Sequence, residues 1–159
     1  MKGNKILLTV LNSLLTEELS TINQFMVHSE MCENWGYTRL HTAIKKQAMD
    51  EMHHVVWLID RIIFFEGSPL VSRLNNLKIG KTVSEMINYE IHSKLDGLSA
   101  YNDAIKLASE VSDQGTVDIL SKILKMEEVH IQWAEKQRAQ IGQMGMENYL
   151  ANQTEYLVN

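Results

Sequence analysis

The sequence predicts an all-α protein, a four-helix bundle in which one long crossover joins the second helix to the third. Two observations carry this prediction. The 159 residues include a single proline, and 45% of them are hydrophobic, with few β-branched clusters. Apolar residues also recur every three or four positions along four long stretches, and glycines separate those stretches. We expect one domain, residues 1–159, long enough to bury a core.

The first predicted helix covers residues 4–34 and ends before Gly36. The second covers residues 39–66, and Gly67 and Pro69 follow it, as is common after a helix C-terminus. The third covers residues 82–111 and the fourth residues 116–140. Gly142 and Gly145 then separate a short terminal segment, residues 147–156, which we expect to form a fifth element.

Residues 67–81 show no helical period and form the predicted crossover. Fully extended, such a segment reaches ~50 Å, whereas the second helix is ~40 Å long. The crossover can therefore run the length of the bundle and place the third helix parallel to the second. Its apolar residues Val71, Leu74, Leu77 and Ile79 lead us to expect that it packs against another surface.

Composition excludes several classes of protein. The net charge of −5 leaves no basic surface for nucleic acid, and the single cysteine excludes an internal disulfide framework. No apolar stretch approaches the ~20 residues of a membrane span. Glu17 and Glu18 follow the first apolar run, where a secretory signal would carry a small-residue cleavage site. We therefore expect a cytoplasmic chain that binds neither membrane nor nucleic acid.

Two Glu-x-x-His pairs, Glu51 with His54 and Glu127 with His130, are the chemically informative motif. A spacing of three residues places each carboxylate and imidazole on one helix face. Glu18 holds a matching position on the first helix. Carboxylate metal sites in four-helix bundles take one Glu from each of two helices and Glu-x-x-His from the other two. Three of these four contributions are present.

The three acids Glu18, Glu51 and Glu127 fall within the apolar stripes of their helices. A buried carboxylate costs several kcal/mol unless it is paired or bound to metal. The alternative is that each helix is rotated so that its acid reaches solvent. Three acids on three helices, two of them followed by histidine, favour the metal. Oxygen and imidazole ligands suit iron, manganese or zinc.

Over essentially its full length the chain resembles a bacterioferritin, a member of the ferritin-like superfamily. The resemblance is carried by Asn34-Trp35-Gly36, Asp50-Glu51-Met52, Asn76-Leu77-Lys78-Ile79-Gly80, Leu95-Asp96-Gly97 and Gly145-Met146-Glu147-Asn148-Tyr149-Leu150. It implies a hollow shell of 24 subunits that stores ferric mineral, with a ferredoxin-type reductant as a partner for iron release. It also implies a haem b at each two-fold interface, with its iron held between methionines of two subunits.

Met52 matches that haem-binding methionine. It follows Glu51 directly and so lies ~100° around the helix from it, off the predicted metal face. Across a two-fold axis, two such residues would place two thioethers around one ligand. Taken without the resemblance, the residues favour a methionine that merely fills an apolar interface. The resemblance favours haem.

On the family pattern, Glu18, Glu51, His54, Glu127 and His130 match ligands of a di-iron ferroxidase centre. The remaining ligand of that pattern is a bridging glutamate, and Lys94 stands in its place, directly before Leu95-Asp96-Gly97. Two further departures concern iron. Phe25 replaces a redox-active tyrosine, and Lys46 replaces a histidine of an inner-surface iron site whose Asp50 is kept.

Charge counting predicts the effect of Lys94. Four glutamates balance two Fe(II) ions, whereas three glutamates and one ammonium balance only one divalent ion. Lys94 is thus expected to take the electrostatic place of the second metal, between Glu51 and Glu127. In the alternative, Glu90, one turn earlier, becomes a substitute ligand and Lys94 turns outward past the bundle rim.

Two functions follow from these alternatives. The chain is a haem-carrying subunit with an impaired ferroxidase centre, in a shell where another subunit type oxidises iron, or it forms a homomeric, fully active ferroxidase through Glu90. Other ferritin-like classes fit less well. One cysteine cannot build the iron module of a rubrerythrin, and residues 153–159 lack the basic tail of a DNA-protecting mini-ferritin. The sequence leaves a homomeric or a mixed shell open.

Overall fold

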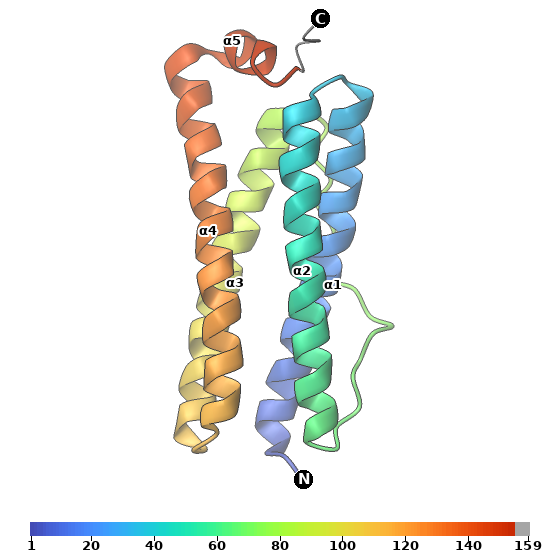
Figure 1. Cartoon of the computed structure of the whole chain (residues 1–159), viewed down its shortest axis with the longest axis vertical. Coiled ribbons are helices and arrows are strands. Elements are labelled where there is room, and N and C mark those ends of the chain that lie inside the picture. Colours follow the sequence, from blue (N-terminus) through green and yellow to red (C-terminus); the bar gives the residue numbers. More distant parts are fainter. Residues whose placement is uncertain (155–159) are drawn as a thin grey trace, which may run out of the picture.

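The computed structural model describes residues 1–154 and is helical throughout its regular structure (Figure 1). The helices are α1 (Lys5–Asn34), α2 (Thr38–Phe64), α3 (Val83–Glu110), α4 (Gln114–Met144) and the short α5 (Met146–Ala151). This confirms the predicted all-α bundle with a fifth C-terminal helix. Residues 155 and 156 of the predicted terminal segment lie outside the described residues.

The four long helices lie side by side, and α5 crosses one end of the bundle (Figure 1). α1 packs mainly on α2 and α3 mainly on α4, with further contacts between α1 and α3 and between α2 and α4. The segment after α2 runs back along the bundle, so that α3 starts at the end where α2 began. The predicted long crossover and the parallel α2 and α3 are therefore confirmed. Among residues 1–154, no helix has the length and apolar character needed to cross a bilayer.

Side-chain caps and one glycine set the helix ends. Asn4, Thr82 and Asp113 each accept a hydrogen bond from the backbone N–H three residues later, at the starts of α1, α3 and α4. α4 runs four residues beyond the predicted end at residue 140. Gly142 stays within this helix, because a glycine weakens a helix without forbidding it. Gly145, with a φ of 82°, is the residue that ends α4.

Two clusters of buried apolar side chains fill the bundle, one toward each end. The first includes Leu11, Leu58, Tyr101 and Leu120, and the second includes Phe25, Leu40, Ile87, Ala134 and the α5 residue Tyr149. On every long helix a short stretch separates the two clusters. Those stretches contain Glu18, Glu51, Lys94 and Glu127, so the buried charged residues lie between two apolar layers.

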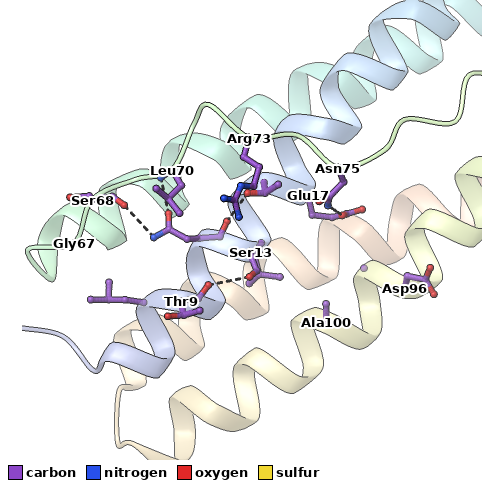
Figure 2. A pocket seen from close by; sticks show the side chains of 15 residues that line it. Thr9, Ser13, Glu17, Gly67, Ser68, Leu70, Arg73, Asn75, Asp96 and Ala100 are labelled. Atoms are coloured by element: carbon purple, nitrogen blue, oxygen red, sulfur yellow. Dashed lines mark hydrogen bonds between the residues drawn. The ribbon is translucent and has the colours of Figure 1, made fainter.

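Polar side chains of α1 hold the crossover. Four of them, spaced four or eight residues apart, hydrogen-bond to its backbone, and Figure 2 shows its first part with Ser68 and Leu70 beside α1. These bonds join Asn12 to Ser68 and Leu70, Ser20 to Asn75, Gln24 to Lys78 and His28 to Gly80. A surface groove of about 690 Å³ remains between this segment, α1 and α3. The hydrogen bonds from α1 give the extended backbone of the crossover the partners that a neighbouring strand would supply in a sheet.

The crossover packs against α1, as expected, but its backbone makes the hydrogen bonds and its apolar side chains stay partly exposed. Val71, Leu74, Leu77 and Ile79 are 57%, 47%, 37% and 37% exposed. The hydrogen bonds with α1 are made by the backbone of the crossover, so these side chains stay partly exposed within residues 1–154.

The hydrogen bond of His28 allows the attachment of the crossover to α1 to be tested. Burial lowers its pKa to about 4, and its Nε2 accepts the Gly80 N–H at 2.9 Å. An unfolded histidine has a pKa of ~6.5. Between about pH 4 and pH 6.5, His28 therefore binds more protons in the unfolded chain than in the folded chain. The free energy of unfolding should therefore fall as pH falls from 6.5 to 4, by up to about 3 kcal/mol.

We predict that His28→Gln, which keeps an acceptor but does not titrate, flattens this part of the dependence of Tm on pH. The measurement is Tm between pH 7 and 4.5 at one protein concentration. Parallel curves for the two proteins would contradict the assignment.

Candidate metal centre

All four long helices contribute to one buried polar cluster. α1 supplies Glu18, α2 supplies Glu51 and His54, α3 supplies Lys94, and α4 supplies Glu127 and His130. The i, i+3 spacing brings both members of each Glu-x-x-His pair to the same helix face. Each of the six side chains belongs to a residue that is at most 4% exposed. The stripe positions read from the sequence thus meet in the middle of the bundle.

Lys94 points into this cluster. Its Nζ donates hydrogen bonds to Glu51 Oε1 and Glu127 Oε2, and lies 5.0 Å from the centroid of the Phe25 ring. The ammonium thus lies between the two glutamates, as charge counting predicted. The outward position that the Glu90 alternative requires is not adopted, because Lys94 is only 4% exposed.

His54 faces the three glutamates. Its Nδ1 lies 3.0 Å from Glu51 Oε2, 3.2 Å from Glu127 Oε1 and 3.4 Å from Glu18 Oε2. One ligand atom from each of these four residues lies within 4.8 Å of every other. Apart from the contact with His54 Nδ1, Glu127 Oε1 is buried without a polar partner among the described residues. Donor atoms so arranged, one of them unsatisfied, fit a metal ion.

Two neighbours complete the surroundings of these ligands. The Tyr101 hydroxyl donates to Glu18 Oε1 at 2.6 Å, and Met126 Sδ lies 3.3 Å from His54 Nε2. Neither Tyr101 nor Met126 was identified from the sequence. The only available signal for Met126 was its position next to Glu127, which does not identify a partner on another helix.

His130 and Asp50 form a separate contact at the edge of the cluster. His130 Nε2 lies 2.9 Å from Asp50 Oδ2, and its Nδ1 lies 3.3 Å from Glu51 Oε1. Lys46 Nζ is 3.7 Å from the same Asp50 oxygen. Asp50, which the resemblance assigned to an inner-surface iron site, is therefore paired with two groups of this chain.

Glu90 lies near the cluster but outside the group of four candidate ligands. It is 3% exposed, and its Oε1 has no hydrogen-bond partner among residues 1–154. Burial raises its pKa to about 8, because the charges of Glu51 and Glu127 add to desolvation while Lys94 opposes it. Glu90 therefore carries its proton at neutral pH in this arrangement.

Burial and charge set the protonation of the cluster. Burial, and then the charges of Glu51 and Glu127, raise the pKa of Glu18 well above its usual value. Burial also disfavours ionised Glu51, but the Lys94 ammonium and hydrogen bonds with Glu18, His130 and His54 together outweigh burial and hold that pKa well below the usual value. For His54, bonds to the three glutamates overcome burial and raise the pKa to about 11. Cationic His54 and Lys94 thus compensate carboxylate charge inside the bundle.

Met52 and His53 lie off the cluster, as expected from their positions on α2. Met52 is 45% exposed, in an outward stripe with Met49, Val56 and Ile63, which are 55%, 50% and 57% exposed. His53 is exposed and stacks on Trp57, with 6.3 Å between ring centroids.

A four-helix bundle with a long crossover and a central carboxylate and histidine cluster defines a ferritin-like protein. A model of the ferritin-like domain matches residues 8–144. The chain is 36% identical to a bacterioferritin of Mycobacterium leprae, over 95% of each chain. It is also 36% identical to a bacterial ferritin of Synechocystis, over 96% of this chain and 99% of the other. The chain belongs to the bacterioferritin family of ferritin-like proteins, a membership that implies iron storage.

Lys94 should stabilise the fold whenever no metal compensates the glutamates. We predict that Lys94→Met destabilises chelator-treated protein by ~3–5 kcal/mol, because it leaves buried carboxylate charge uncompensated. For a chain of this size that corresponds to a fall in Tm on the order of 10 °C. The matched control is Lys106→Met, an exposed lysine on the same helix, which should change Tm little. Equal Tm values for the two variants would show that Lys94 carries no such role.

Proposed function

We propose that this chain is the haem-binding subunit of a 24-subunit, iron-storing shell, and that its own ferroxidase centre is impaired. The observation that carries the proposal is the position of Lys94. Its ammonium is hydrogen-bonded to Glu51 and Glu127, one glutamate from each Glu-x-x-His pair, at the position of the missing bridging glutamate. Family membership supports iron storage and an oligomeric shell, and the buried group of Glu18, Glu51, His54 and Glu127 supports a metal site. We include His130 in that site because its position matches the family pattern.

The proposed defect concerns the substrate, Fe(II). Rapid reduction of O₂ by a di-iron centre needs two Fe(II) ions held close together by bridging carboxylates. A unit positive charge ~4 Å away repels each unit charge by ~4 kcal/mol at an effective dielectric of 20, and a divalent ion by twice that. Lys94 is tethered to the backbone and cannot diffuse away. The second Fe(II) therefore has neither free bridging oxygens nor a favourable field.

The proposed haem site is supported by the outward stripe on α2. Met52 carries an exposed thioether with exposed apolar side chains one turn on either side, Met49 and Val56. Two copies of this stripe facing across a two-fold axis offer two thioethers and an apolar surface for a macrocycle. When bound, haem b supplies a one-electron redox centre. Met52 from each of two subunits would hold it.

The impaired centre implies a division of labour between subunits. We propose a cytoplasmic mixed shell in which a second, ferroxidase-competent subunit oxidises iron and this chain contributes haem, with a ferredoxin-type reductant for iron release. The contacts of Asp50 also support a division of labour between subunits. Its pairing with His130 and Lys46 leaves it poorly placed to receive iron at the inner surface.

Iron oxidation by the isolated chain tests the proposal. We predict slow oxidation of Fe(II) by O₂ without a fast phase, because only one of the two positions is open to iron. Lys94→Glu should produce a fast phase that saturates at two irons per subunit. Stopped-flow absorbance under limiting Fe(II) is the measurement, on assembled particles of equal size.

A fast two-iron phase in the unmodified chain would favour the homomeric, fully active alternative. The buried, partnerless Oε1 of Glu90 is the observation that keeps this alternative open. Glu90→Gln would then abolish the fast phase. If the proposal is correct, Glu90→Gln leaves the slow rate unchanged.

Haem binding is tested separately. We predict that Met52→Leu abolishes uptake of haem b and leaves particle size unchanged, since leucine fills a similar volume but offers no ligand atom. The control is Met49→Leu, which removes another exposed thioether one turn away and should retain haem. Absorbance spectra and haem-to-protein ratios report the outcome. Stoichiometric haem in the Met52 variant would show that another residue is the axial ligand.

A further inference from the structure

Three thioether side chains are exposed along the seam between α1 and α2. Met49 and Met52 belong to the outward stripe of α2, and Met26 of α1 is 38% exposed. None of the three belongs to either apolar cluster of the bundle. The sulfur atoms that make polar contacts within residues 1–154 are those of Cys32, Met86, Met126 and Met144. The three thioethers of the seam are thus open to a ligand.

Met49 and Met52 form a Met-x-x-Met pair on one face of α2. Residues three apart on a helix have their Cβ atoms ~5–6 Å from each other. Methionine is unbranched and has three rotatable side-chain bonds, so the two sulfurs of such a pair can approach a common ion. The pair is separate from Glu51 and His54, which point into the bundle.

Met26 leaves α1 on the side of α2. Glu17 lines the groove between α1 and α3, and Met26, nine residues later, lies ~2.5 turns further around the helix. Its side chain is therefore on the edge away from α3, where α2 packs. On α2, Asp50 faces His130 of α4, and Met52 lies ~200° around the helix from Asp50. Met52 is therefore on the edge of α2 that borders α1.

The register of the two helices brings the three thioethers toward one level. Ser29 of α1 contacts His41 of α2 through its carbonyl oxygen, 3.0 Å from Nδ1, so Met26 lies opposite the turn that precedes Met49. Helical side chains lean toward the N-terminus of their own helix. Because α1 and α2 run in opposite directions (Figure 1), Met26 leans toward the level of Met49. Met52 leans toward the same level from the other side.

Thioether sulfur is a soft ligand, and among common metal ions it selects Cu(I). Fe(II), Mn(II) and Zn(II) favour the carboxylate and imidazole groups of the buried cluster instead. A Cu(I) ion bound by neutral thioethers keeps a charge of +1. Water screens that charge at an exposed seam, whereas in the interior it would need a compensating carboxylate. The seam therefore suits a soft monovalent ion.

We propose that Met26, Met49 and Met52 form a surface site for one Cu(I) ion per chain. This inference does not rest on the proposed function, and it gives Met52 a second ligand. One thioether cannot bind copper and haem iron at the same time. Copper and haem therefore exclude each other at this surface, and the copper load of the chain limits how many subunit pairs can take up haem.

Titration of the assembled, haem-free full chain with Cu(I) tests the site. The experiment is anaerobic, with a reductant present and a chromophoric Cu(I) chelator as competitor. Met26→Leu and Met49→Leu should each weaken binding ~10-fold or more, because leucine keeps a similar volume but offers no ligand atom. The matched control is Met144→Leu, an exposed methionine of α4, which should change the affinity less than ~2-fold.

Three results of the titration would overturn the inference. They are the absence of competition with the chelator, full affinity in Met49→Leu, and a site that is lost in Cys32→Ser or Met126→Leu instead. The last result would place the ion inside the bundle, at the sulfur of Cys32 or beside His54.

The pH dependence of binding identifies the ligand type. Thioethers carry no proton, so the affinity should stay constant between about pH 5.5 and pH 8, the range in which histidine titrates. His53, the exposed neighbour of Met52, is the competing ligand, and His53→Gln should leave the affinity unchanged. X-ray absorption at the copper edge should show only sulfur neighbours. Nitrogen neighbours, or binding that weakens with His53→Gln, would overturn the inference.

Haem uptake separates this inference from the proposed function. Met49→Leu should lose Cu(I) and keep haem, whereas Met52→Leu should lose both. Haem binding through Met52 in a chain without a Cu(I) site would overturn the copper site alone. A Cu(I) site that needs Met49 and Met52, in a chain that takes up no haem, would overturn the haem part of the proposed function alone. Tight Cu(I) binding to fully haem-loaded particles would contradict the mutual exclusion.

Discussion

The contact between the Lys94 ammonium and the carboxylates of Glu51 and Glu127 constrains the centre of this bundle. It joins α3 to α2 and α4, while Tyr101 joins α3 to Glu18 of α1. Four helices that otherwise pack mainly in two pairs are thus linked at one level. The apolar clusters above and below exclude water from that level. Each charge there must therefore be compensated by a neighbour or by an ion.

A tethered cation and an exchangeable one have different consequences. In a complete carboxylate centre the positive charges are metal ions, which can enter, change oxidation state and leave. A lysine supplies one such charge permanently, so the fold keeps its electrostatic balance whether or not the second position receives metal. Under the proposed function, the same lysine also occupies the position of a carboxylate that two-metal chemistry needs. Stability of the bundle and activity of the centre would then be separated in this chain.

The sequence predicted the helices, the crossover and the convergence of the six cluster residues, because each follows from periodicity along one helix. Its errors came from features that periodicity does not report. Gly142 was read as a helix end, but a glycine with ordinary helical φ costs little, and α4 continues to Met144. The crossover packs against α1 as expected, but α1 binds its backbone, and the apolar side chains on which the expectation rested stay partly exposed.

The sequence by itself determined which residues face the interior, including the inward position of Lys94, because a stripe position fixes the direction of a side chain from its own helix. Only the tertiary structure decided which atoms meet. The division of each glutamate between α3 and His54, the pairing of His130 with Asp50, and the contact of Met126 with His54 depend on rotamers and on the axial offsets between helices. Those offsets are set by packing across the whole bundle, and no single helix encodes them.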